Sequence, residues 1–234
     1  MSKWKIPDRD TDRIDTIRNA VEREDMLPES ERVLLDGEIV EMRYFIRQYE
    51  GETMVLKNAK DDKAKTMLQY KELFKNAQMY ISHFIRVLQL TVIRKEIPAA
   101  LLMLYGFESD RELNIPDLAT EDAILSWGDK IIRGEQERIS RGGRPLYNPT
   151  IANVRVHYEL FDDIIQSLKI YSRNVLRYQT SVFEMRRKAA GYIDSIWSRV
   201  DEKYSKESEE KYQEILKLYK FLFYNSGEQL NVFN

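Results

Sequence analysis

The chain has 234 residues, of which 43% are hydrophobic and 32% charged, and its formal net charge is −2. This balance provides no global electrostatic attraction to nucleic acid, so we expect no nucleic-acid partner. The chain contains no cysteine, which excludes disulfides, thiolate metal sites and a cysteine nucleophile. With only 9 glycines and 6 prolines, the composition favours long helices.

The N-terminal sequence lacks the apolar run of a signal peptide. No stretch of about 18 apolar residues is free of charge, which is the length that a membrane-spanning helix requires. We therefore expect a cytoplasmic protein without a membrane span.

The first predicted helix covers residues 9–25. Ile14, Ile17 and Val21 recur at helical spacing and form its apolar face. Asp10 or Thr11 is suited to capping its first turn, because the side-chain oxygen of either residue accepts hydrogen bonds from free backbone N–H groups.

A much longer helix is predicted over residues 29–96, where apolar residues return with a seven-residue period. The repeat keeps its phase but becomes polar and rich in lysine near residues 57–62. Two interpretations stay open: one continuous helix with a solvated middle, or a helical hairpin that turns at residues 57–62. The preserved phase favours the continuous helix.

Ile97-Pro98 ends this helix, and residues 108–119 form a predicted connecting loop. The loop is the best candidate for a boundary between two halves of the chain. A shorter helix follows over residues 120–140, with Ile124 and Ile131 on its apolar face.

Residues 148–203 carry the clearest helical signal. Asn148-Pro149 is suited to a helix start, since asparagine caps free N–H groups and proline fits the first turn. Two columns of mainly apolar residues then alternate by three and four positions, which makes one seam along a helix. The first column turns polar at Ser172, Gln179 and Arg186. These positions indicate either a wetter part of the bundle or a buried polar site for a ligand.

The last predicted helix covers residues 205–225 and is apolar on all sides near its end. A helix of that kind is buried centrally or against another chain. We therefore predict an interaction surface made by Leu218, Tyr219, Phe221, Leu222, Phe223 and Tyr224.

The order of short helix, proline and long helix occurs twice, which suggests pseudo-repeats over residues 9–96 and 120–203. Letter-by-letter similarity between them is low, so duplication is a hypothesis. Residues 1–234 are predicted to form a single all-α domain, an elongated antiparallel helical bundle built on two very long helices.

No catalytic constellation stands out. A carboxylate-bridged dimetal site needs Glu-x-x-His pairs, and neither His83 nor His157 has an acid three residues before it. No glycine-rich phosphate-binding motif with its lysine occurs either. We expect no metal, no cofactor and no enzymatic activity.

One turn is a candidate ligand site: Arg141, Gly142, Gly143 and Arg144, directly before the predicted start of a helix. Free backbone N–H groups, the helix dipole and two arginines could together hold an anion. The same residues also suit an ordinary turn between helices.

The leading functional hypothesis is a non-enzymatic structural or interaction protein that offers helical faces to a protein partner or to a second copy of itself. Two alternatives stay open. One is a membrane-acting amphipathic helical protein. The other is a small anionic-ligand binder or enzyme that uses the Arg-Gly-Gly-Arg turn.

Overall fold

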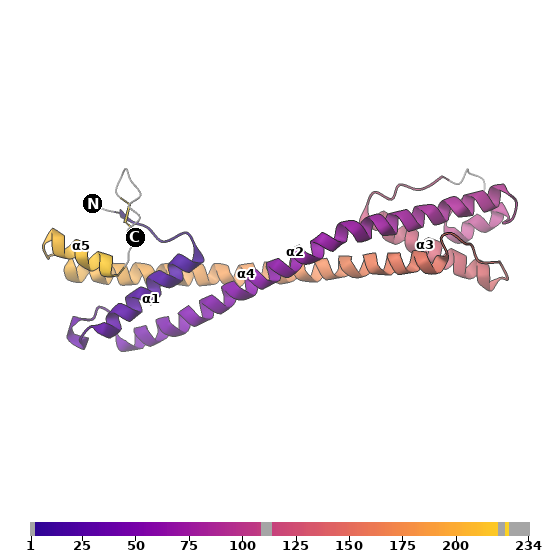
Figure 1. Cartoon of the computed structure of the whole chain (residues 1–234). Helices are drawn as coiled ribbons and strands as arrows, with labels where there is room; N and C mark the ends of the chain where they lie inside the picture. The colour runs from indigo at the N-terminus through magenta and orange to yellow at the C-terminus, as the bar shows by residue number, and fades with distance from the viewer. Residues whose placement is uncertain (1–2, 109–113, 220–222, 225–234) are drawn as a thin grey trace. The chain divides into compact units, whose positions relative to one another are not determined.

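The computed structural model describes residues 3–108, 114–219 and 223–224, and it confirms the predicted all-α helical bundle with two very long helices (Figure 1). Its α-helices, in chain order, are α1 (Asp10–Met26), α2 (Asp36–Ile93), α3 (Glu121–Ser140), α4 (Ile151–Tyr204) and α5 (Glu209–Leu218). None of the described helices is long and apolar enough to cross a membrane.

Shorter elements lie between the helices and near the chain ends. Two 3-10 helices follow α1 and α2, namely η1 (Glu29–Glu31) and η2 (Ala99–Tyr105). Two strands of two residues each, β1 (Lys3–Trp4) and β2 (Phe223–Tyr224), pair in antiparallel orientation.

The chain folds into two compact units. Unit 1 contains Met1–Lys60 and Asn174–Asn234, and unit 2 contains Asp61–Arg173. Both α2 and α4 contribute one part to each unit. The units therefore do not divide at the predicted boundary, because the loop over residues 108–119 lies inside unit 2.

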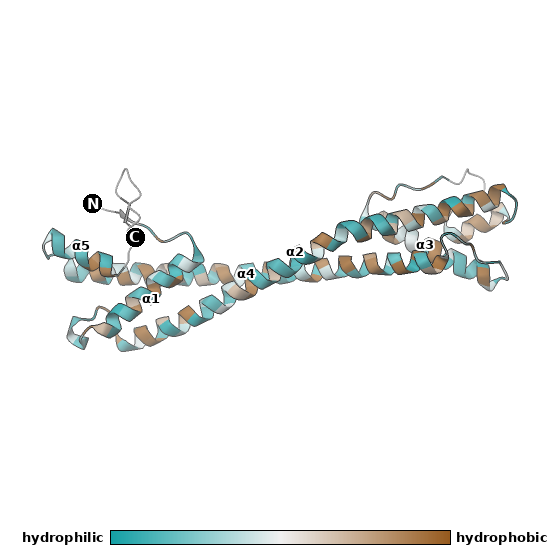
Figure 2. Cartoon of the chain, in the orientation of Figure 1, coloured by the Kyte–Doolittle hydropathy of each residue, from teal (hydrophilic) through white to brown (hydrophobic). Residues whose placement is uncertain are grey.

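Helix α2 is continuous over 58 residues, as the preserved phase of its apolar repeat predicts. No residue between Ala59 and Ala77 is buried, which accounts for the polar stretch near its middle. The predicted start near residue 29 is wrong, because Glu29–Glu31 form η1 and the backbone is extended at Arg32. Figure 2 shows hydrophobic and hydrophilic residues alternating along both long helices, as expected of helices with one buried side.

In unit 1, α2 and α4 run antiparallel. Glu38 near the start of α2 forms an ion pair with Arg199 near the end of α4, and further along α2 the Phe45 ring lies 4.9 Å from the Tyr192 ring. The core of this unit also includes apolar residues of α1 and α5, among them Ile14, Ile17, Ala20, Val21 and Leu216.

Helix α1 is joined to both long helices at its first residue. Asp10 accepts a hydrogen bond from the Tyr49 hydroxyl of α2 at 2.6 Å. It also accepts two from the Arg186 guanidinium of α4, each at 2.7 Å. Arg186 therefore forms a surface ion pair, and of the other two polar seam residues Gln179 is exposed and Ser172 half-buried.

Unit 2 has a core of its own. The Phe161 ring of α4 lies 6.0 Å from Tyr70 and 5.5 Å from Phe74 of α2. One turn earlier in α4, His157 stacks on Tyr80 with the ring centres 3.9 Å apart. These contacts make the two helices antiparallel here too.

Two glycines let α3 approach its neighbours closely in unit 2. A Cβ on Gly128 would lie 2.3 Å from the Tyr158 ring of α4. A Cβ on Gly134 would lie 2.7 Å from the Leu104 carbonyl oxygen and from the Tyr105 ring, both in η2. Helix α3 could therefore not lie this close to α4 and η2 if a residue with a side chain replaced either glycine.

Helix α4 begins at Ile151, three residues after the predicted start at Asn148-Pro149. Asn148 has a φ of 55°, so the chain is still in a turn at that residue. Thr150 acts as the cap instead, with its hydroxyl oxygen 3.3 Å from the Asn153 N–H.

Candidate functional site

A buried cluster of hydrogen bonds joins the end of α3 to η2 and to the segment before α4. Glu135 is fully buried and Arg138, one turn further, is only 5% exposed. The Glu135 carboxylate accepts hydrogen bonds from Nε and Nη2 of Arg138, at 2.9 and 2.8 Å, and from the Leu146 N–H at 2.9 Å. The Tyr105 hydroxyl donates to the same carboxylate and accepts from Nε of Arg138 at 2.8 Å.

Electrostatics keep Tyr105 neutral and Arg138 charged in this cluster. Burial and the hydrogen bond to Glu135 raise the pKa of the Tyr105 hydroxyl. Burial alone would lower the pKa of Arg138, but its bonds to Glu135 and Tyr105 outweigh burial and raise it. A tyrosine that stays neutral and an arginine that stays charged are poorly suited to proton transfer near neutral pH. The cluster is thus a structural latch.

One guanidinium nitrogen of Arg138, Nη1, takes no part in the hydrogen bonds of the latch. Besides its bond to Glu135, Nη2 donates to the Arg144 carbonyl oxygen at 2.7 Å. No described residue accepts a hydrogen bond from Nη1. A Cβ on Gly143 would lie 2.5 Å from this atom, so glycine leaves room for the guanidinium at this place.

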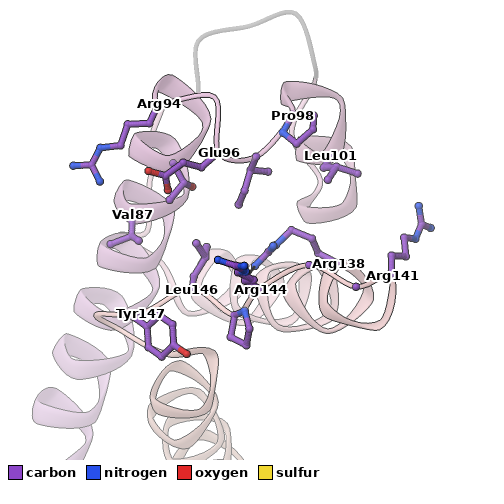
Figure 3. Close-up of a pocket in the computed structure, with 15 residues that line it drawn as sticks. Val87, Arg94, Glu96, Pro98, Leu101, Arg138, Arg141, Arg144, Leu146 and Tyr147 are labelled. Atoms are coloured by element: carbon purple, nitrogen blue, oxygen red, sulfur yellow. Dashed lines mark hydrogen bonds between the residues drawn. The ribbon is translucent and has the colours of Figure 1, made fainter.

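Arg138 forms part of the wall of a pocket of about 780 Å³ in unit 2 (Figure 3). The pocket lies where α2 ends, α3 ends and the chain turns toward α4. All four residues of the predicted anion site line it: Arg141, Gly142, Gly143 and Arg144. Its apolar walls come mainly from Val87, Ile97, Pro98, Leu101, Pro145 and Leu146.

The chain is locally basic around this pocket. Residues 86–105 and 135–150 carry six basic side chains (Arg86, Arg94, Lys95, Arg138, Arg141 and Arg144) against three acidic ones (Glu96, Glu135 and Glu137). Arg138 and Arg141 are neutralised by Glu135 and Glu137, at 2.8 and 2.7 Å.

No described residue forms an ion pair with Arg94 or Arg144. In Figure 3 Arg94 and Arg141 point away from the pocket at its rim, whereas Arg138 reaches toward its middle. Arg138 therefore offers a guanidinium inside the pocket whose charge Glu135 balances, while Arg144 lines the pocket without an ion-pair partner among the described residues.

The predicted anion site is brought together only in part. Because α4 begins at Ile151, the turn does not directly precede a helix, and the predicted contribution of the helix N-terminus is wrong. The N–H groups of Gly142 and Gly143 donate to the carbonyl oxygens of Ile139 and Arg138, at 2.9 and 3.0 Å. The groups of this turn that could still hold an anion are its guanidinium groups, and the pocket adds that of Arg138, which is not among the residues predicted from the sequence.

The predicted C-terminal interaction surface is also changed. Helix α5 ends at Leu218, which is 44% exposed, and not near residue 225. Tyr219 is buried in the core of unit 1, so it does not lie on the surface. Phe223 and Tyr224 form β2, while Phe221 and Leu222 lie outside the described residues.

Unit 1 contains a second buried glutamate that sequence reasoning missed. Glu24, in the last turn of α1, accepts hydrogen bonds from the N–H groups of Val33 and Leu34 at 2.8 and 2.9 Å, and from the Tyr219 hydroxyl. Burial and the Glu24 bond raise the pKa of Tyr219. Glu24 thus fixes the segment that leads from α1 into α2.

Within the described ranges, no three histidine or acidic side chains are close enough to hold a metal ion. Comparison with known proteins finds no relative: no family model, no curated protein and no solved structure matches the chain.

Proposed function

We propose that the chain is a non-enzymatic interaction protein that presents a helical face to a second helix, from a protein partner or from another copy of itself. One observation carries this proposal. The part of α2 in unit 2 has large apolar side chains on the side away from the core: Leu68, Met79, Leu90 and Ile93, which are 81%, 41%, 49% and 67% exposed.

These four residues lie on one side of α2, with charged residues between them. Leu68, Met79 and Leu90 are spaced by about three helical turns, so they return to the same side of the helix. The buried residues Ile81 and Leu88 lie on the opposite side. A helix that exposes several large apolar side chains opposite its core has apolar surface that the core does not bury, which is typical of a contact surface.

Charged residues on the same line indicate the chemistry of the partner. Lys75 and Arg86 are exposed between the apolar positions, and Glu72 is the acid among them. A partner helix with an apolar stripe and flanking acidic residues would complement this pattern.

The buried ionic groups also support a non-enzymatic role. The partners of Glu24 and Glu135 are backbone N–H groups, a tyrosine hydroxyl and, for Glu135, a guanidinium. Each group is held by hydrogen bonds that stabilise the connection between a short helix and a long one.

A photo-crosslinking side chain at Met79 tests the proposal in cells that express the full chain. We expect a specific crosslinked product, with a partner or with a second copy, that disappears in the double variant Leu68→Glu/Leu90→Glu. Met54, an exposed methionine on the part of α2 in unit 1, is the matched control position. If crosslinking at Met79 is no stronger than at Met54, the proposal is wrong.

A further inference from the structure

We propose that the basic pocket of unit 2 binds an amphipathic organic anion, a small molecule with a carboxylate or phosphate group on an apolar body. This site is independent of the exposed line of α2 that carries the proposed interaction function. The argument rests on what lies inside the pocket and on what its walls are made of.

The anionic group has a pre-positioned partner in Arg138. Its side chain is 5% exposed, and its guanidinium is held by bonds to Glu135, Tyr105 and the Arg144 carbonyl oxygen, yet no described residue accepts a hydrogen bond from its Nη1. A fixed donor loses little conformational freedom when a ligand binds. A carboxylate or phosphate oxygen would supply the acceptor for Nη1.

Arg144 supplies charge that Glu135 does not cancel. Glu135 neutralises Arg138, so Arg138 alone would attract an anion weakly. Arg144 follows Gly143 directly, lines the same pocket and has no ion-pair partner among the described residues. The two guanidinium groups together favour an anion over a neutral ligand.

The walls favour a ligand with an apolar body. Val87 and Leu101 are half-buried and Pro98 and Pro145 exposed, so these four side chains present apolar surface to the pocket that they line. The volume of about 780 Å³ lies in the range of small-molecule sites, which are typically apolar with a few polar groups that orient the ligand. An inorganic ion would leave these walls uncovered.

Isothermal titration calorimetry of the full chain tests the inference with defined probes: decanoate, decyl phosphate, inorganic phosphate and decanol. We expect the two amphipathic anions to bind in a one-to-one complex, and each at least tenfold more tightly than inorganic phosphate or decanol. If decanol binds as tightly as the two amphipathic anions, the pocket is only an apolar cleft. If inorganic phosphate binds as tightly as they do, the pocket is only a site for an anionic group. Either result would overturn the inference.

Two variants assign the site. Arg144→Gln keeps the backbone carbonyl that Arg138 requires, and it should weaken decyl phosphate binding by about tenfold. Tyr147→Glu places an anion at the pocket wall and should abolish binding. The controls are Arg133→Gln, an exposed arginine of α3, and Tyr44→Glu, a tyrosine of unit 1 that is as exposed as Tyr147.

Both controls should bind as the wild type does, with unchanged helical circular dichroism in all four variants. Unchanged affinity in Arg144→Gln would overturn the assignment. Co-sedimentation with vesicles that contain an anionic phospholipid separates the two sources of such a group. Binding to the vesicles without binding to monomeric decanoate or decyl phosphate would identify a membrane surface as the ligand and overturn the small-molecule inference.

Discussion

Glu24 and Glu135 hold corresponding positions in the two units. Each is fully buried near the end of a short helix, and each accepts bonds from a tyrosine hydroxyl and from backbone N–H groups that lead toward the next long helix. Removing a carboxylate from water without such partners costs several kcal/mol. The hydrogen bonds therefore make an acid tolerable on an apolar face, and they also fix the path of the connecting segment.

Replacing Glu135 by alanine should destabilise unit 2 by about 3–5 kcal/mol, because it leaves the buried charge of Arg138 without its partner. Urea unfolding followed by circular dichroism would measure the loss. The control is Glu137→Ala, which breaks an exposed pair with Arg141 and should change the unfolding free energy by less than about 1 kcal/mol. Similar losses in both variants would contradict the structural role of the latch.

Tyr49 should make the protein lose stability at alkaline pH. Burial and the hydrogen bond to Asp10 raise the pKa of the Tyr49 hydroxyl to about 12, above its ordinary value of 10.0. A raised folded-state pKa stabilises the fold fully below pH 10, and this contribution disappears as pH rises toward 12. The unfolding free energy of the wild type should therefore fall in that window.

The variant Tyr49→Phe isolates this contribution. It should be less stable than the wild type at neutral pH, and the difference between the two should shrink as the pH rises above 10. Asp10 keeps its bonds to Arg186 in both proteins, so the comparison reports on the hydroxyl. A difference that stays constant with pH would refute the assignment.

The two buried glutamates could have been predicted in part. Glu24 follows Val21 by three residues and Glu135 follows Ile131 by four, so both acids lie on the apolar face of a predicted short helix. That placement indicates a buried carboxylate, which must find partners. Its partners could not be predicted, because Tyr219 and Tyr105 reach the acids only through the tertiary fold.

At the scale of the elements, the helical glycines divide into two kinds. Gly128 and Gly134 of α3 touch neighbouring elements, while an added Cβ on Gly51 of α2 or Gly191 of α4 would meet nothing within 4 Å. In the helix interior glycine is less favourable than alanine by about 1 kcal/mol. Whether a glycine-to-alanine substitution stabilises or destabilises the protein should therefore depend on the atoms that surround the added Cβ.

Gly134→Ala should destabilise the protein by about 1–3 kcal/mol despite the better helix propensity, because its Cβ would lie 2.7 Å from a backbone carbonyl oxygen. Gly51→Ala should stabilise it by up to about 1 kcal/mol. Thermal unfolding of both variants under the same conditions shows whether each is more or less stable than the wild type. Stabilisation by Gly134→Ala would show that η2 does not hold this position against α3.

The sequence predicts the helices better than their ends. The seven-residue repeat that continues in phase through residues 57–62 correctly indicates one continuous α2. Helix ends depend on single residues, such as Asn148 with its left-handed φ. They also depend on short segments that form another structure instead of α-helix, such as the 3-10 helix η1. The composition of the apolar run after Leu218 predicts a helix. In the structure, Tyr219 packs in the core of unit 1 and β2 pairs with β1.

At the scale of the whole molecule, the two cores are separate clusters of buried residues. Neither α2 between Ala59 and Ala77 nor α4 between Ile165 and Val175 contains a buried residue. Few buried contacts make a segment easy to open locally. The two units should therefore respond separately to mutations in their cores.

Glu24→Ala should raise amide hydrogen exchange in unit 1, because two backbone N–H groups and a tyrosine hydroxyl lose a buried acceptor, at about 1–3 kcal/mol for each group. Residues 77–165 should keep their protection. Exchange measured by mass spectrometry on peptides from each unit distinguishes the outcomes. A uniform increase over both units would mean that they unfold as one cooperative body.

The internal duplication stays a prediction, and two similarities between the units are in line with it. The spacing from Asp10 to Glu24 equals that from Glu121 to Glu135, and both first-turn acids accept a hydrogen bond from a tyrosine of α2. Each unit also combines one short helix with the start of the long helix that follows it. Letter-by-letter similarity could not reveal this, because few of the equivalent positions keep the same residue type, Glu24 and Glu135 among them.

The division of the long helices has a consequence for a chain emerging from the ribosome. Unit 2 is one continuous segment, so its core is complete once the first part of α4 has been made. Unit 1 joins the first 60 residues to those after Arg173, so the apolar face of α1 must wait for the last part of the chain. We expect unit 2 to fold first during synthesis, while α1 and the start of α2 are the segments that a chaperone would need to protect.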